Sequence, residues 1–439
     1  DHMRSHSAVF GDVDLDGDLD LFITSELASN RLYLNDGSGH FRDITLQAGL
    51  STREGGMCAS FADINHDGLP DLAVSFWNSG NKLYLNTTSD DQVSFRDITS
   101  FTSLNDAVPS RSNGLVFGDF DNDGNTDLLI VNRKAPNVLY RNPGNGYMNR
   151  YSVLGSEDSL LISNGVLAAD FNLDGWQDLF LTNAGGNRMY RNDGGGKFTD
   201  VTQLWGIYST GYGTGCSWGD VDHDGDPDLY ASVFTQGSSV LYINRLEKGY
   251  SVKLKFRGTR SARDGTGVKV WLYRAKNGQL AGYREILSGG GYGSGNMKEA
   301  LLGIHPEEFY RLHIKFPLSP DTLVLDSIQG STTLEIWEET GWSAAITDTL
   351  RFLKSILADR EMQLLFLRTL ATSLLLIVWI IMSAHHSPFI VRIRKLSFLF
   401  LMGIYLFSEI YWFYSPLSWR WFLPGAITLL FFTIIHLFT

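Results

Sequence analysis

The chain has 439 residues and a formal net charge of −12, so it is long enough for two or more domains. Of its 48 acidic residues, 20 are concentrated in five short strings. The sequence has no long basic run and no base-stacking motif, and we therefore expect no nucleic-acid partner.

The first element in chain order is an acidic string of nine residues that occurs five times, with the pattern Asp-x-Asp/Asn-x-Asp-Gly-x-x-Asp. Oxygen ligands on alternate residues, with a glycine at the bend, are how a chain wraps a hard divalent cation. Ca²⁺ suits this pattern best because it accepts roughly six to eight oxygens in a flexible shell. We expect about one Ca²⁺ ion in each string, up to five in all. The strings, here named loops 1 to 5, are Asp12–Asp20, Asp63–Asp71, Asp119–Asp127, Asp170–Asp178 and Asp220–Asp228.

Side chains at loop positions 1, 3, 5 and 9 are the predicted ligands. Asparagine replaces aspartate at position 3 of loops 2 and 4, so we expect these less charged loops to bind the ion more weakly. The predicted side-chain ligands are Asp12, Asp14, Asp16 and Asp20; Asp63, Asn65, Asp67 and Asp71; Asp119, Asp121, Asp123 and Asp127; Asp170, Asn172, Asp174 and Asp178; and Asp220, Asp222, Asp224 and Asp228.

The loops recur at intervals of 50 to 56 residues, which is typical of an array, a solenoid or a propeller. Each loop is followed by an apolar run, then by Asn-x-Leu-Tyr-x-Asn or a variant, and in three copies by Phe-x-Asp-Ile/Val-Thr. Gly, Asn and Asp separate these runs, so each unit contains four short strands. Four strands at this period fit a propeller blade.

Two other interpretations of the acidic strings are weaker. An EF-hand needs a glutamate at position 12, but the residues there are apolar and lie within the next predicted strand. Acidic turns explain one copy well, but not five copies that keep the same four oxygens. The position-12 residues are Ile23, Val74, Ile130, Leu181 and Ala231.

The repeat unit resembles the FG-GAP or VCBS repeat, the calcium-loop blade also found in integrin α-chain propellers. The resemblance implies a propeller over residues 5–247 and a fifth ligand, the backbone carbonyl at position 7. It also implies seven blades, two of them upstream of the five loops, and a five-bladed ring is the alternative. The implied carbonyl ligands belong to Asp18, Leu69, Asn125, Trp176 and Asp226.

The two cysteines, Cys58 and Cys216, precede loops 2 and 5 on equivalent predicted strands. We expect both to be small buried residues without a disulfide, because strands three blades apart do not approach closely enough.

Residues 250–340 lack the repeat and predict a small β-domain. It resembles the ASPIC/UnbV domain in residues 263–270, 289–295 and 314–320, although Phe316 stands where that family tends to have tryptophan. The resemblance implies no catalytic residues. The glycine-rich segment 287–296 has no following Gly-Lys-Ser/Thr, so it predicts tight turns and not a phosphate loop.

The C-terminal part is apolar. Residues 345–361 predict an amphipathic helix at a membrane surface, and residues 362–439 predict three transmembrane helices over 364–382, 396–414 and 421–438. The basic loop after the first span predicts a cytoplasmic position for that loop and an extracytoplasmic one for the propeller. Glu409 and His436 lie within spans, where an ionisable group can have a functional role, although we favour structural ones.

These features together predict a membrane-anchored, extracytoplasmic calcium-binding propeller that works as a binding or scaffold module. It would be periplasmic in a Gram-negative cell, with its spans in the inner or plasma membrane. Its expected partners are the lipid bilayer, a protein or glycan outside the cytoplasm and subunits within the membrane. Two alternatives are a sensor with a cytoplasmic output domain and a hydrolase that carries FG-GAP repeats. The sequence has no Gly-x-Ser-x-Gly or His-Glu-x-x-His motif, so we expect no enzyme activity and assign no catalytic or organic-cofactor residue.

Overall fold

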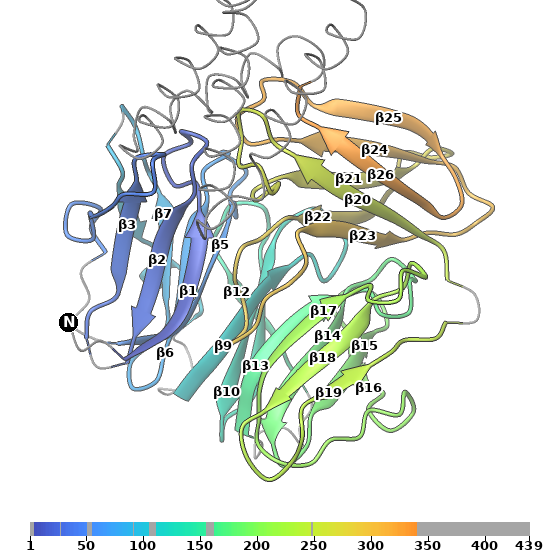
Figure 1. The fold of residues 1–439 in the computed structure, drawn as a ribbon, viewed down its shortest axis with the longest axis horizontal. Coiled ribbons are helices and arrows are strands. Elements are labelled where there is room, and N and C mark those ends of the chain that lie inside the picture. The colour runs from blue at the N-terminus through green and yellow to red at the C-terminus, as the bar shows by residue number, and fades with distance from the viewer. Residues whose placement is uncertain are drawn as a thin grey trace, which may run out of the picture. The chain divides into compact units, whose positions relative to one another are not determined.

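The computed structural model describes residues 4–339 apart from 27, 51–54, 91, 105–110, 155–161 and 247–248. These residues belong to one compact unit, and their fold is all-β apart from the 3-10 turn η1 (Thr99–Phe101) (Figure 1). The predicted surface helix and transmembrane helices, over residues 345–439, lie outside the described residues. Among the residues that are described, no helix is long and apolar enough to cross a membrane.

Each acidic loop joins the first two strands of an antiparallel sheet, which we call a blade. The predicted four strands form in blades 1 to 4, and blade 5 has three strands in the described part of the chain. Blades 1 and 2 consist of β1 (Ser5–Gly11), β2 (Asp20–Ser25), β3 (Arg31–Asn35) and β4 (Phe41–Asp43), and of β5 (Gly56–Ala62), β6 (Asp71–Phe76), β7 (Lys82–Asn86) and β8 (Phe95–Asp97).

The later blades repeat this order, and one residue pair between β10 and β13 links blades 3 and 4 into one sheet. Their strands are β9 (Arg111–Gly118), β10 (Asp127–Arg133), β11 (Asn137–Arg141) and β12 (Asn149–Leu154); β13 (Ile162–Ala169), β14 (Asp178–Ala184), β15 (Arg188–Asn192) and β16 (Phe198–Asp200); and β17 (Gly213–Gly219), β18 (Asp228–Val233) and β19 (Val240–Tyr242).

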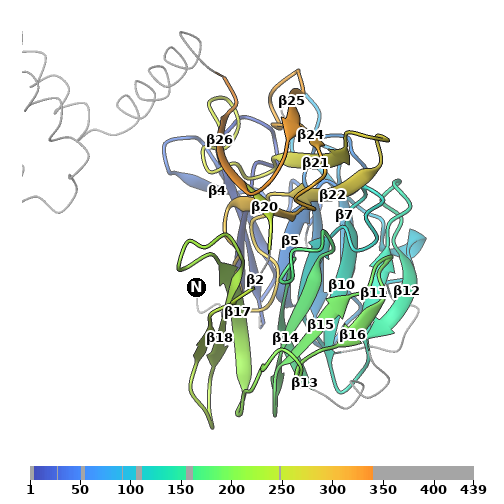
Figure 2. The same ribbon diagram turned by 90° about the vertical axis from the view of Figure 1, so that its right-hand side faces the viewer.

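The blades pack face to face, and their first strands β1, β5, β9, β13 and β17 follow one another side by side (Figures 1 and 2). Alternate side chains of one strand enter two different cores. On β10, Leu128 and Ile130 pack against blade 2, whereas Leu129 and Val131 pack against blade 4. This double burial explains why the strands are continuous apolar runs. The fold is therefore β-propeller-like.

The predicted β-domain consists of two small sheets packed on one core. In the first sheet β20 lies between β23 and β26 and pairs with β26 in parallel, and the second sheet has the order β22-β21-β24-β25. The strands are β20 (Ser251–Arg257), β21 (Lys269–Arg274), β22 (Leu280–Glu285), β23 (Glu299–Gly303), β24 (Tyr310–Lys315), β25 (Leu323–Ile328) and β26 (Thr332–Trp337).

The glycine-rich segment between β22 and β23 runs along the first strands of the blades. Ser288 Oγ accepts a hydrogen bond from Phe10 N on β1, and Gly291 N donates to Leu115 O on β9 at 2.6 Å. Gly289 forms a β-bridge with β5, and Ser294 Oγ accepts from Cys216 N on β17 at 3.0 Å. One segment of the β-domain thus ties together strands from four blades.

Candidate metal centres

The ends of each loop are held by their own aspartates. In loop 1 the two carboxylate oxygens of Asp12 accept hydrogen bonds from Asp16 N and Gly17 N, both at 3.0 Å. Asp20 Oδ2 accepts from Val13 N at 2.9 Å. Loops 2, 3 and 4 repeat all three bonds. The carboxylates at positions 1 and 9 therefore stabilise the loop backbone through hydrogen bonds of their own.

The chain turns sharply at positions 4 and 6. The glycines at position 6 have φ between 90° and 95°, which only glycine adopts readily. Position 4 also lies in the left-handed region although it is never glycine, and each such residue costs about 1 kcal/mol. The position-4 residues are Leu15, His66, Asn122, Leu173 and His223, with φ from 53° to 65°.

This turn brings carboxylates together in loops 1, 3 and 5, where oxygens of positions 1, 3 and 9 lie within 4.8 Å of one another. The three sets are Asp12, Asp14 and Asp20; Asp119, Asp121 and Asp127; and Asp220, Asp222 and Asp228. In loops 2 and 4 position 3 is asparagine, and the amides of Asn65 and Asn172 donate to the position-5 carboxylates at 2.8 Å.

Position 5 is not part of these sets among the residues that the structure describes. Its carboxylate instead accepts the backbone N–H of position 7, at 2.8 to 3.1 Å in the five loops. The bond fixes the orientation of the peptide that joins positions 6 and 7, which is next to the peptide whose carbonyl is implied as a ligand. The position-5 acceptors are Asp16, Asp67, Asp123, Asp174 and Asp224, and the position-7 donors are Asp18, Leu69, Asn125, Trp176 and Asp226.

Burial of these carboxylates, and then their closeness to one another, opposes their ionisation. Burial, and then the neighbouring Asp16, raise the pKa of Asp12 to about 7, and burial raises the pKa of Asp20 to about 8. The corresponding groups of loops 3 and 4 shift in the same direction and for the same first cause. Burial raises the pKa of Asp119 and Asp170 to about 7 and of Asp127 and Asp178 to about 8.

The donor set fits a hard divalent cation. Within the described residues, Asp14 Oδ1, Asp220 Oδ1 and Asp226 Oδ1 are buried without a hydrogen-bond partner. Buried carboxylate oxygens are costly unless they are paired or coordinate a metal. Oxygen-only sets of this kind match the ligand preference of Ca²⁺.

The Asn-x-Leu-Tyr-x-Asn motif has two structural roles that sequence reasoning did not find. Its first asparagine closes a hairpin, as where Asn81 Oδ1 accepts from Phe76 N at 3.1 Å. Its second asparagine connects neighbouring loops, since Asn142 Nδ2 donates to Ile64 O in loop 2 at 2.7 Å. The same contact to the preceding blade is made by Asn86, Asn192 and Asn244.

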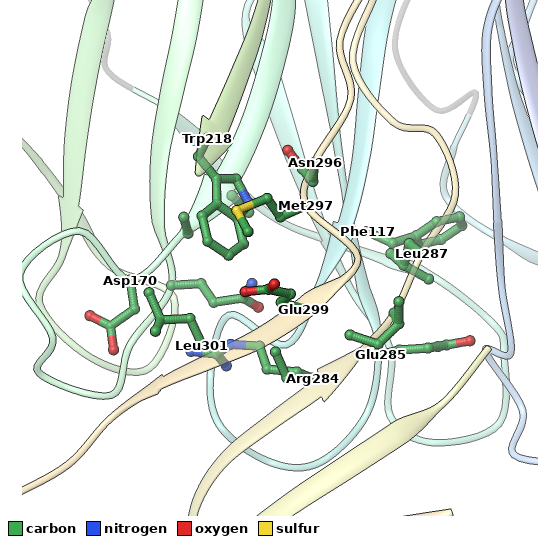
Figure 3. A pocket seen from close by; sticks show the side chains of 15 residues that line it. Phe117, Asp170, Trp218, Arg284, Glu285, Leu287, Asn296, Met297, Glu299 and Leu301 are labelled. Carbon is green, nitrogen blue, oxygen red and sulfur yellow. The ribbon is translucent and has the colours of Figure 1, made fainter. Parts of the chain in front are cut away.

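A cavity of about 60 Å³ lies where the β-domain meets the blades, with Asp170, Trp218, Arg284 and Asn296 in its wall (Figure 3). Pockets for organic ligands are typically at least roughly 300 Å³, so this one is too small for such a ligand.

Both cysteines are buried and free, as predicted. Burial raises the pKa of Cys58 to about 11 and that of Cys216 to about 12, so both are neutral thiols at neutral pH.

The acidic loops, the blades and their spacing define a protein of the propeller-like repeat class. FG-GAP-like repeats match residues 12–74, 67–130, 119–180 and 170–231, which together span half of the chain. The chain belongs to the FG-GAP-like repeat family.

The chain is also similar to cartilage acidic protein 1 of Mus musculus and of Homo sapiens. Each is 28% identical over 172 residues, which is 37% of this chain and 26% of the relative. The chain therefore matches about a quarter of the length of these relatives.

Among solved structures, a lectin of Agrocybe aegerita that recognises non-reducing terminal N-acetylglucosamine is 18% identical, with a TM-score of 0.40 over 55% of this chain and 64% of that chain. BBS1N in complex with ARL6DN is 12% identical, with a TM-score of 0.31 over 64% and 81%. Both scores are too low for an inference about function.

Proposed function

We propose that this protein is a calcium-binding propeller that works as a binding or scaffold module and not as an enzyme. The observation that carries the proposal is the convergence of three carboxylates, two of them buried, in each of loops 1, 3 and 5. A cluster of this kind is unfavourable without a counter-charge, so an ion bound there contributes directly to the folding free energy.

Side chains at positions 1, 3 and 9 would hold the ion most closely, with the position-5 side chain and the position-7 carbonyl completing the shell. Loops 2 and 4 would first have to rotate the amides of Asn65 and Asn172, whose nitrogens now donate to Asp67 and Asp174. These two loops are therefore the weaker sites of the proposal.

We further propose that the propeller lies outside the cytoplasm on a membrane anchor formed by residues 345–439. Calcium loops of modest affinity fill where calcium is near millimolar, which is the situation outside the cytoplasm. The blades and the β-domain then offer a rigid surface for a protein or glycan partner, and the anchor offers one for subunits within the membrane.

The first test is calcium uptake. Titration of the purified full chain with CaCl₂, followed by calorimetry, is expected to show more than one bound ion, and MgCl₂ is expected to bind more weakly. Extraction in mild detergent with and without chelator, followed by identification of the co-purifying proteins, tests the scaffold. Loss of a partner on chelation supports the proposal, whereas partners that are unchanged by chelation contradict a calcium-dependent scaffold.

A further inference from the structure

The β-domain places basic side chains among the carboxylates of the loops. Lys253 Nζ of β20 lies 2.7 Å from Asp220 Oδ2, the first residue of loop 5. Lys269 Nζ of β21 pairs in the same way with Asp63 Oδ2, the first residue of loop 2. Neither contact is local, since the partners are 33 and 206 residues apart.

Both pairs are buried. The side chains of Lys253 and Lys269 are 10% and 11% exposed, and those of their two aspartates are 3% exposed. Lysine is almost never buried to this degree unless it is paired. Because the two pairs join the β-domain to the propeller, they are part of the interface that holds these two parts together.

Each lysine contacts one oxygen, Oδ2, of its aspartate. In loop 5 Lys253 contacts Oδ2, while Oδ1 of Asp220 is buried without a hydrogen-bond partner in the described part of the chain. In loop 2 Lys269 shares Asp63 Oδ2 with Gly68 N. An ammonium group and a divalent cation can therefore approach the same carboxylate, but two positive charges at this separation repel each other.

The other loops have a different charge environment. Loop 3 pairs Asp121 with Arg141 of its own blade at 2.5 Å, and the buried Arg284 interacts electrostatically with the carboxylates of Asp170 and Asp119. Among the described residues, no ion pair joins a lysine or arginine to Asp12 or Asp14 of loop 1. The β-domain thus neutralises some loops and not others.

We propose that Lys253 and Lys269 are built-in counter-ions of loops 5 and 2, which hold the β-domain on the propeller without a bound cation and lower the affinity of these two loops for one. The part that concerns the cation rests on the calcium function proposed above. The part that concerns the interface does not, because it describes the protein in the absence of any ion.

The test uses the full chain and the variants Lys253→Met and Lys269→Met, which keep most of the length of the unbranched side chain and remove its charge. Lys255→Met is the matched control, because Lys255 lies on the same strand, pairs with Glu299 and is 47% exposed. Melting temperatures are measured by tryptophan fluorescence in chelator and in CaCl₂.

In chelator, Lys253→Met and Lys269→Met are expected to melt lower than the parent by a shift on the order of 5 °C, because each leaves a buried aspartate unpaired, whereas Lys255→Met is not. In CaCl₂ most of this loss is expected to disappear. In a calcium titration the two variants are expected to bind about tenfold more tightly at one site, because a nearby positive charge is gone.

The double variant Lys253→Met/Asp220→Asn removes both charges and is expected to recover at least half of the loss in chelator. Variants that melt like the parent in chelator, or a double variant that recovers nothing, would overturn the proposal. So would an unchanged or weaker calcium affinity. If the parent itself binds no calcium, the proposed function fails, and the chelator measurements still decide whether the lysines are counter-ions.

Discussion

The side chain of Asn142, on blade 3, donates a hydrogen bond to the backbone carbonyl of Ile64, in the acidic loop of blade 2, at 2.7 Å. The backbone N–H of Asn142 at the same time donates to Asp127, the last carboxylate of its own loop, at 2.8 Å. One residue therefore connects loop 2 with loop 3. This hydrogen bond can transmit a displacement of one loop to the neighbouring blade.

Asn142→Ala is expected to destabilise the protein by about 3 kcal/mol, because it leaves the buried carbonyls of Ile64 and Thr126 without their donor. Asn35→Ala is the matched control in blade 1. The Asn35 amide donates to Leu19 O at 3.1 Å, within its own loop, so its loss should cost only about 1 kcal/mol. Thermal melts of the two variants check this, and equal costs would contradict a role in joining blades.

A second pair of matched variants can be made in the glycine-rich segment, at Gly291 and Gly295. Gly291 has φ of 72°, and a Cβ there would lie 2.3 Å from Val166 O, so Gly291→Ala is expected to cost about 3 kcal/mol or more. Gly295 of the same segment has open space around the Cβ position, so Gly295→Ala should stay within about 0.5 kcal/mol. If both variants melt alike, the segment is not packed between the blades as described.

The chelated protein should become less stable as the pH rises. Burial raises the pKa of Asp20, Asp127 and Asp178 from 3.8 to about 8 in the folded state. A carboxyl group of this kind favours folding while it is protonated, so its contribution is present at low pH and is lost as the pH rises through about 8. Melting temperatures in chelator are expected to fall between about pH 5 and pH 8, and to stay level in CaCl₂. A rise over this range in chelator would contradict the burial of these carboxylates.

Positions 1 and 5 of one loop should differ in their effect on calcium. Asp119 belongs to the convergent set of loop 3, whereas Asp123 accepts the N–H of Asn125 at 2.8 Å. Asp119→Ala is therefore expected to abolish the site, and Asp123→Ala to weaken it roughly tenfold, as one ligand of several. Calcium titration of the two variants checks the order. A larger loss from Asp123→Ala would show that the ion sits differently.

The sequence predicts the loops and blades well because their signals are local. The aspartates Asp12 and Asp20 of one loop are only eight residues apart. The run Leu128–Val131 consists only of apolar residues, and this composition by itself indicates that both faces of the strand are buried. The interface with the β-domain could not be predicted in this way. In β20, Lys253 and Lys255 fall on the same face by alternation, yet Lys253 is buried and Lys255 is exposed.

The sequence also does not predict where the glycine-rich segment packs. Glycine density predicts turns, and Gly289, Gly290 and Gly291 do have positive φ. The close approach of Gly293 to Gly215, however, depends on the packing of a strand 78 residues earlier, which no local pattern reveals.

The most direct test of the calcium loops is a calorimetric titration of the full chain with CaCl₂, compared with a triple variant that replaces the position-3 aspartates by alanine, Asp14→Ala/Asp121→Ala/Asp222→Ala. We predict that the parent binds several ions and that the variant loses those of loops 1, 3 and 5, because each convergent set loses one of its three carboxylates. An equal number of bound ions in the two proteins, or no calcium bound by the parent, would contradict the account.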